Sequence, residues 1–260
     1  LDELARRQHT LVRAEKLASL GTLLSGVAHE LNNPLSNIST SAQILVESGE
    51  ADPDFRRQLL DDIDQETRRA VRIVRSLLDY ARDRGFQRRP VNLAELLDET
   101  LRFLKTQRPP GIEVRLDIPA DLLVGADRAR LQQAFINLIG NAFEAIGDYG
   151  ELRIEAHRAQ AGMTAEGVFP ALVGACRPGT PVVDITFTDS GPGIPPAILT
   201  RVFDPFFTTK PVGQGNGLGL FIVHEIVEEH CGCIGVDTPP EGGARFHLRL
   251  PVAEATSEKP

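Results

Sequence analysis

The sequence predicts two domains, an all-α helical hairpin followed by an α+β two-layer sandwich. Apolar residues recur every three or four positions through the first third of the chain, which is typical of long helices. Strand-like and helix-like segments alternate after that point. The chain has 260 residues, which is enough for one to two domains.

Composition excludes several classes of protein. The net charge is −8, Trp is absent and no sustained basic face with aromatic residues occurs, so nucleic-acid binding is disfavoured. No apolar run approaches the roughly 18 residues of a membrane helix, so we expect a cytoplasmic fragment without a membrane segment. Because the chain opens on Leu1 rather than methionine, we expect an upstream sensor domain in a longer protein. We expect Cys176, Cys231 and Cys233 to be reduced thiols.

Residues 1–18 have helical spacing and many charges, which predicts a coiled-coil segment entering from upstream. The apolar phase of Leu4 and Leu11 differs from that of Leu17 and Leu20. Such a phase slip changes the local supercoil. A signal-transmitting joint and an ordinary frayed chain end both fit this pattern.

The first helix is expected to run from near Leu4 to near Val46, with Pro34 kinking it. Its apolar repeat places the imidazole of His29 on the opposite, solvent-facing side. A turn over residues 47–54 leads into a second helix, which Gly85 ends. The expected apolar residues of the two helices are Leu20, Leu24, Val27, Leu31, Leu35 or Pro34, Ile38, Ala42 and Leu45, then Leu59, Ile63, Ala70, Val74, Leu77 and Ala81.

A lone hairpin of residues 19–85 cannot enclose two long apolar stripes. Pairing two copies as a four-helix bundle buries both stripes, so we expect a homodimer. The alternative is that the hairpin packs on its own C-terminal domain, which the narrow, heptad-like stripes disfavour.

Residues 86–92 are interpreted as a linker, residues 93–252 as the second domain and residues 253–260 as a tail. Asn92 caps the first helix of this domain, with Glu95 three residues later. The remaining elements are expected as a strand at 111–118, a turn at 124–127, a helix at 128–146, a strand at 152–156, a long loop or hairpin extension at 157–180, a strand at 182–189, a helix at 218–230, and strands at 234–236 and 244–250.

Four motifs in this domain indicate chemistry. Asn137 and Asn141 share one face of a helix, and amide oxygens are good ligands for a Mg²⁺ ion that also binds phosphates. Asp189 ends a strand and precedes Gly191 and Gly193, so a carboxylate acceptor stands beside a backbone that a flat base can approach. The other two motifs are an aromatic loop ending in a cation, residues 201–210, and a glycine-rich run before a helix, residues 213–220, which is typical of an anion-binding site.

The order of these motifs after the segment His29-Glu30-Leu31-Asn32-Asn33-Pro34 resembles the catalytic core of sensor histidine kinases. The resemblance covers residues 15–252, and this form of the histidine motif resembles the nitrogen-regulation-type branch. It implies a dimerisation and histidine-phosphotransfer hairpin, followed by an ATP-binding domain of the Bergerat type. Implied partners and cofactors are ATP, Mg²⁺ and a response-regulator receiver domain.

The resemblance also implies a role for each matching residue. His29 accepts the γ-phosphoryl group, Glu30 orients the ring and acts as base, and Asn33 positions water or a partner during an accompanying phosphatase activity. The residues implied for the nucleotide are Asn137 and Asn141 (the latter for Mg²⁺), Asp189, Gly191 and Gly193 for adenine, Phe203 and Phe206 for the lid, and Lys210, Gly215, Gly217, Leu218 and Gly219 for the phosphates. Ala244 replaces the more usual hydroxyl residue of the last glycine box, Gly242-Gly243-Ala244.

Two alternatives to a kinase are a non-catalytic dimeric nucleotide-binding scaffold and a gyrase-type ATPase. The intact motifs argue against a scaffold. In the hydrolytic relatives a glutamate activates water four residues before the magnesium-binding Asn. That position is Asn137 here, and a neutral amide cannot act as the base.

Overall fold

The structure is a computed structural model, and it describes residues 26–48, 52–81, 85–161, 171–174, 176, 179–210, 215 and 217–253. The chain forms two compact units, one of residues 1–84 with 205–218 and the other of residues 85–204 with 219–260. The predicted coiled-coil entry at 1–18 and nearly all of the predicted tail lie outside the described residues. Within the described part of the chain, no helix has the length and hydropathy that crossing a bilayer requires.

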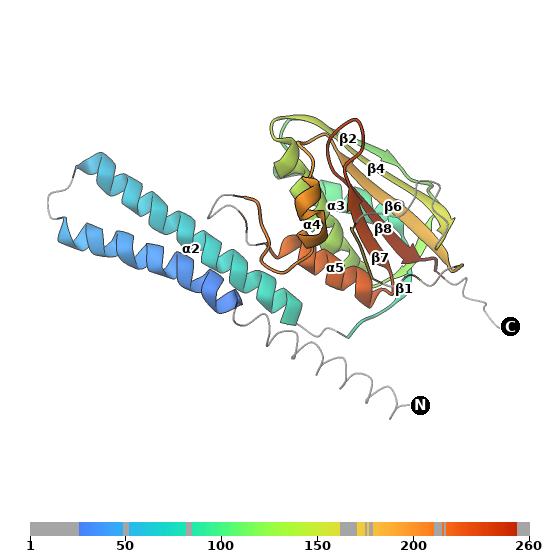
Figure 1. The fold of residues 1–260 in the computed structure, drawn as a ribbon, viewed down its shortest axis with the longest axis horizontal. Helices are drawn as coiled ribbons and strands as arrows, with labels where there is room; N and C mark the ends of the chain where they lie inside the picture. The colour runs from blue at the N-terminus through green and yellow to red at the C-terminus, as the bar shows by residue number, and fades with distance from the viewer. Residues whose placement is uncertain are drawn as a thin grey trace, which may run out of the picture. The chain divides into compact units, whose positions relative to one another are not determined.

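Two helices make up most of the first unit (Figure 1). The first covers residues 26–47 and continues through Pro34, so the proline does not end it. The second, α2, spans Pro53–Ala81. Pro53 stands at its first position, where the missing backbone N–H costs no helical hydrogen bond. The hairpin that the sequence predicted is therefore present.

In the apolar stripes, the structure decides between the two alternatives at Leu35 and Pro34 and corrects one position of α2. Pro34 is buried whereas Leu35 is 53 % exposed, so the proline occupies the stripe of the first helix. In α2, Ile73 is fully buried and Val74 is 41 % exposed, so the choice of Val74 was wrong by one residue. A helix turns about 100° per residue, which carries the neighbouring side chain off the buried face.

A six-stranded sheet forms one layer of the second unit, in the order β2-β4-β6-β8-β7-β5. Strands β2 and β4 are parallel, and the other neighbours are antiparallel. Helices α3, α4 and α5 lie together on one face of this sheet (Figure 1). The elements are β1 Arg89–Asn92, α3 Leu93–Phe103, a 3₁₀ turn Leu104–Thr106, β2 Gly111–Asp117, β3 Leu123–Ala126, α4 Arg128–Ile146, β4 Tyr149–Gln160, β5 Ala171–Gly174, β6 Pro181–Asp189, a 3₁₀ turn Pro196–Arg201, α5 Gly219–Glu229, β7 Cys233–Asp237 and β8 Arg245–Pro251.

The core lies between the helices and the sheet, as an α+β two-layer sandwich requires. Phe135 of α4 and Phe187 of β6 meet with ring centroids 5.5 Å apart, and both are almost fully buried. Ile139, Val223 and Leu248 are fully buried around them. The predicted fold class is therefore confirmed.

Strands β1 and β3 occupy segments that the sequence predicted as a linker and a turn. They pair antiparallel with each other in a separate two-stranded sheet, with Arg89 opposite Ala126. Residues 89–92 are thus not linker, and residues 123–126 are a strand rather than a turn. Within the predicted loop or hairpin extension at 157–180, the described residues include the end of β4, which continues to Gln160, and β5, an edge strand beside β7.

The helices begin at the polar residues that the sequence indicates. Asn92 accepts a hydrogen bond from the backbone N–H of Glu95 at 3.1 Å, which confirms the predicted cap. Asp127 caps α4 through the N–H groups of Ala129 and Arg130, at 3.1 and 3.2 Å. Each cap satisfies backbone donors that have no partner within the helix.

His230 links the end of α5 to the start of α4. Its ring is fully buried, its Nε2 accepts from the backbone N–H of Asp127 at 2.9 Å, and its Nδ1 lies 2.6 Å from the carbonyl of Ile226. This pair of partners defines a neutral imidazole that carries its proton on Nδ1. Burial lowers the pKa of His230, although Glu229 and Asp127 nearby oppose the shift and Arg88 adds to it.

Acidification should therefore destabilise the second unit. In the unfolded chain this histidine takes up a proton at the ordinary pKa of about 6.5, whereas folded His230 resists protonation. The contribution of His230 to the free energy of unfolding is therefore fully present above that pH and is lost as the pH falls below it. Between pH 7 and 5.5 we expect the free energy of unfolding to fall, with His230 contributing at most about 1 kcal/mol of the loss. Urea unfolding of the intact chain measures this, and His230→Gln should flatten the pH dependence. Burial also lowers the pKa of His247, so a residual slope is expected; an unchanged slope in the variant would exclude His230.

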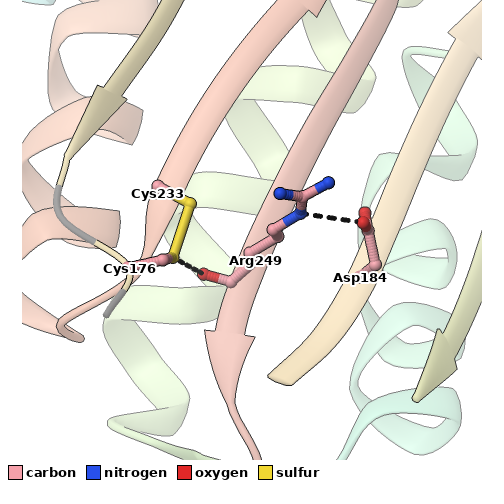
Figure 2. The surroundings of a disulfide bond; sticks show 4 residues. All are labelled: Cys176, Asp184, Cys233 and Arg249. Atoms are coloured by element: carbon pink, nitrogen blue, oxygen red, sulfur yellow. Dashed lines mark hydrogen bonds and ion pairs between the residues drawn. A yellow bond between two sulfur atoms is a disulfide. The ribbon is translucent and has the colours of Figure 1, made fainter. Parts of the chain in front are cut away.

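The state of the cysteines also differs from the prediction. Cys176 and Cys233 form a disulfide (Figure 2). Cys231 is a free, exposed thiol. The prediction of three reduced thiols was therefore wrong for this pair. The 57 residues that separate the two cysteines in sequence explain why spacing could not reveal the contact.

Candidate functional site

His29 is exposed on the first helix, between the buried stripe residues Val27 and Pro34. The imidazole therefore faces away from the buried stripe, as its spacing predicts. A ring in this position is accessible to a reactant from outside the hairpin.

Glu30 faces the other helix of the hairpin. Its Oε2 lies 3.1 Å from Nη2 of Arg69, a side chain of α2 that is only 5 % exposed. Glu66 is 3.9 Å from the same guanidinium, and it accepts a hydrogen bond from Asn37 at 3.1 Å. A network of charges and an amide thus joins the two helices directly beside the histidine.

Sequence reasoning missed Arg69, although a signal was present. Arg69 stands four residues before the buried Ile73, and Glu30 stands three residues after the buried Val27. Charged residues at stripe spacing on both helices indicate a buried pair across the hairpin. Asn33, the third expected catalytic residue, is half-buried one turn after Glu30.

Replacing Arg69 with methionine should destabilise the hairpin by about 2 kcal/mol, because the variant leaves the partly buried Glu30 carboxylate without its cation. Urea unfolding of the intact chain, followed by far-UV circular dichroism, measures the change. Arg68→Met is the matched control, since Arg68 pairs with Asp64 on the exposed surface at 2.8 Å and should matter little. Equal stability of the two variants would contradict a role for the Glu30–Arg69 pair.

Asn137 and Asn141 lie on the face of α4 that meets the start of α5. The amide Nδ2 of Asn137 donates to the carbonyl of Gly219 at 3.3 Å. A Cβ on Gly219 would lie 3.8 Å from Nδ2 of Asn141. The second unit thus brings together three of the predicted nucleotide residues at the N-terminal end of a helix, where backbone N–H groups favour anions.

Asp189 ends β6 and is 5 % exposed. Its Oδ1 accepts from the backbone N–H of Gly191 at 2.9 Å and of Ala244 at 3.2 Å. Burial raises the pKa of Asp189, and these two hydrogen bonds oppose the shift. Both bonds use Oδ1, so Oδ2 is the oxygen with which the carboxylate can accept from a ligand.

Glycines bring three loops into contact around Asp189. Gly243 has φ +81°, and a Cβ there would lie 1.8 Å from the carbonyl oxygen of Asp189, a distance at which no side chain fits. A Cβ on Gly193 would lie 2.8 Å from the carbonyl of Gly243, and one on Gly191 would lie 2.9 Å from the carbonyl of Ala145 at the end of α4. The geometry therefore requires glycine in both predicted boxes. Ala244, which departs from the family pattern, contributes through its backbone.

A hollow of about 800 Å³ opens beside this set. Asp189, Ser190 and Gly191 line it together with residues of β4, β6 and β8, with Asp117 of β2 and with residues of the 239–243 turn. Neither Asn137 nor Asn141 is among its lining residues. The hollow, which Asp189 lines, is therefore distinct from the asparagine face.

The other residues predicted for the nucleotide site lie partly in the second unit and partly in the first. In the second unit, Phe203 is buried with its ring 6.3 Å from that of His224. In the first unit, Phe206 has φ +64°. A Cβ on Gly217 would lie 2.3 Å from the carbonyl carbon of Phe206. A Cβ on Gly215 would lie 3.1 Å from Cδ of Lys210. Residues 205–218 thus bring Phe206, Lys210, Gly215 and Gly217 close together, and Leu218 is buried in the same segment.

Two family models match the chain. Residues 19–85 match the "His Kinase A (phospho-acceptor) domain", and residues 126–254 match the "Histidine kinase-, DNA gyrase B-, and HSP90-like ATPase". His29 falls in the first match, and Asn137, Asn141 and Asp189 fall in the second.

Curated relatives and solved structures agree with these matches. The chain is 38 % identical over 248 residues to sensor histidine kinase ZraS of Escherichia coli O157:H7, covering 94 % of this chain and 49 % of that protein. It is 34 % identical to the signal transduction histidine-protein kinase AtoS of Escherichia coli K12, covering 94 % and 37 %. The chain thus spans about half or less of the curated relatives it matches.

Among solved structures, histidine kinase ThkA in complex with response regulator protein TrrA is 28 % identical, with a TM-score of 0.71 over 96 % of this chain and 67 % of that one. The catalytic domain of ThkA is 32 % identical, with a TM-score of 0.50 over 64 % of this chain and 95 % of that one.

Proposed function

This chain belongs to the histidine kinases, and we propose that it transfers the γ-phosphoryl group of ATP to its own His29 and then to an aspartate of a response-regulator receiver domain. The observation that supports this most directly is the exposed imidazole of His29 within the phospho-acceptor match. The carboxylate and asparagines of the ATPase match supply the groups that a nucleotide needs.

The first step forms a bond between a ring nitrogen of His29 and the γ-phosphorus, and breaks the bond from that phosphorus to the bridging oxygen, so that ADP leaves. We propose that Glu30 takes the ring proton. Arg69 positions this carboxylate from the neighbouring helix, at 3.1 Å. Transfer of this kind depends on alignment and neutralisation of charge more than on covalent chemistry by the protein.

The adenine amino group is proposed to donate to Asp189 Oδ2, because Oδ1 is already engaged by Gly191 and Ala244. Glycine at 191, 193 and 243 lets the loops around Asp189 pack closely and so shapes the proposed adenine site. Lys210, together with Gly215 and Gly217 of the same segment, is proposed to contact the phosphates.

Mg²⁺ is proposed to bind Asn141, with Asn137 beside it. The residues fit the ion, since a carboxamide oxygen is a suitable hard ligand and the Nδ2 atom of Asn137 already donates to Gly219. When bound, the ion neutralises phosphate charge. Because Asn137 is an amide rather than a carboxylate, we expect slow hydrolysis of ATP by water.

A homodimer is proposed through the hairpin. Large apolar side chains remain exposed on the hairpin of a single protomer, among them Val46 at 84 % and Leu60 at 53 %. A four-helix bundle of two hairpins covers such residues. The proposed receiver-domain partner is consistent with the similar structure of ThkA, which is a complex with a response regulator. Asn33, near the acceptor histidine, is proposed to assist removal of the phosphoryl group from that partner.

The experiment is to incubate the chain with Mg²⁺ and ATP labelled at either the γ- or the α-phosphate. The γ-label should become bound to the protein in a form that acid removes and alkali preserves, as expected of a phosphoramidate. The α-label should stay in solution. Label that survives acid would indicate a hydroxyl acceptor and contradict the proposal.

A further inference from the structure

All three cysteines lie at one corner of the second unit. The Cα atoms of Cys176 and Cys233 are 5.7 Å apart and their sulfur atoms are bonded, a separation typical of disulfides. Cys231 is free and exposed two residues before Cys233. Neither the proposed kinase chemistry nor the nucleotide site uses any of them.

The disulfide fastens an edge strand. Strand β5 is the last in the sheet order, and its described partner is β7. Gly174 of β5 stands opposite Cys233, and a Cβ on Gly174 would lie 2.6 Å from the carbonyl oxygen of Gly232. Cys176 follows two residues later, so the covalent bond lies next to this close approach of the two backbones. A pairing of four residues would otherwise hold this edge by its backbone hydrogen bonds and packing.

The same site accommodates the reduced pair. The Sγ atom of Cys176 lies 3.9 Å from the carbonyl oxygen of Arg249 (Figure 2), so a thiol there has an acceptor for its weak donor. Cys233 is 1 % exposed, and a buried free cysteine packs as a small apolar residue. Arg249, opposite Cys233 in the register, is held by Asp184 at 2.9 Å. Reduction therefore leaves the Cys176 thiol with an acceptor and the Cys233 thiol in an apolar-like packed position.

We propose that Cys176–Cys233 is a reversible redox tether of β5, exchanged with thiols and disulfides of the glutathione class. A thiolate attacks Sγ of Cys176, which is half-buried whereas Cys233 is buried. A mixed disulfide forms, the bond to Cys233 breaks, and Cys233 leaves as a thiolate that takes up a proton. A second thiolate attacks the sulfur of the first thiol, which yields the small-molecule disulfide and the Cys176 thiol. Oxidation by the small-molecule disulfide is the reverse sequence.

Reduction is expected to loosen β5 and leave the rest of the sheet unchanged. The tether joins residues that are 57 apart, so breaking it removes the covalent link that holds this strand in place. The affected amides are those of Ala171–Gly174, and strand β2, Gly111–Asp117, lies at the opposite edge as an internal reference.

The experiment equilibrates the intact chain in buffers rich in either oxidised or reduced glutathione. After an acid quench and denaturation, maleimide labelling should count three free thiols in the second buffer, since the chain has 3 cysteines, and at most one in the first, where the exposed Cys231 can itself carry glutathione. Hydrogen exchange over residues 171–174 should be at least about tenfold faster in the reduced chain, because local opening is easier there. Exchange over residues 111–117 should not change.

Two variants sharpen the test. Cys176→Ser should show the fast hydrogen exchange in both buffers. The matched control Cys231→Ser should keep the difference in exchange and count no free thiol in the oxidised buffer and two in the reduced one. Three labelled thiols in the oxidised buffer would overturn the proposal, as would identical exchange of β5 in the two buffers. Because the unmodified chain supplies this comparison, a variant that folds poorly does not weaken it. Loss of kinase activity alone would bear on the proposed function and not on the tether.

Discussion

Replacing His29 with glutamine is expected to reduce labelling by γ-labelled ATP by a factor on the order of 10³ or more, because the glutamine amide offers no nucleophilic lone pair. ATP affinity should stay nearly unchanged, since the groups proposed to bind adenine and Mg²⁺ lie on α4, α5 and β6 of the second unit. Acid-labile label is the first measurement, and calorimetric ATP binding is the second.

The matched control for this variant is His157→Gln, because His157 is also an exposed histidine but lies on β4. It should label like the unmodified chain. If His29→Gln kept its acid-labile phosphate, the acceptor assignment would be wrong. If it lost both label and ATP binding, the substitution would have disturbed more than the nucleophile.

Asp189→Asn is expected to weaken ATP binding by about ten- to a hundredfold, which corresponds to one charge-assisted hydrogen bond of about 1.5–3 kcal/mol. The amide can place its oxygen toward Gly191 and Ala244, but it then presents N–H donors to the adenine amino group. Because only the ionised carboxyl accepts on both oxygens, affinity in the unmodified chain should also fall as the pH drops toward the raised pKa of Asp189.

Isothermal titration with ATP measures the effect, and Asp117→Asn is the control, since Asp117 is an exposed carboxylate on β2. The thermal transition of each variant distinguishes a lost ligand contact from a lost fold. Unchanged affinity in folded Asp189→Asn would remove Asp189 from the proposed adenine site.

Local patterns predicted much of the fold. The spacing of apolar residues indicated both hairpin helices, and the polar residue Asn92 marked the start of α3. These features depend on neighbours within a few residues, which the sequence contains. The same spacing placed His29 outside the stripe, and the structure confirms that it is exposed.

Features that depend on distant partners were not predictable. Strands β1 and β3 have four residues each and are defined by pairing with one another across the chain. The Cys176–Cys233 bond joins two elements at the far edge of the sheet. Short segments carry too little periodicity to reveal such contacts.

The candidate site, too, could be predicted only in part from the sequence. The motifs around Asn141 and Asp189 identified the residues, but not the reason that Gly243 must be glycine, which is its approach to the carbonyl of Asp189. Arg69 was missed because a charged residue at a stripe position is interpreted as a break in the pattern until its partner, Glu30, is known.

Direct mapping of the phosphorylated residue tests the central claim most sharply. The chain is allowed to react with Mg²⁺ and ATP, digested at neutral to alkaline pH, and analysed by mass spectrometry with electron-based fragmentation, which preserves the phosphorus–nitrogen bond. The account predicts one phosphorylated residue, His29, on a ring nitrogen. Phosphate on any other residue, or none on His29 while the chain binds ATP, would contradict it.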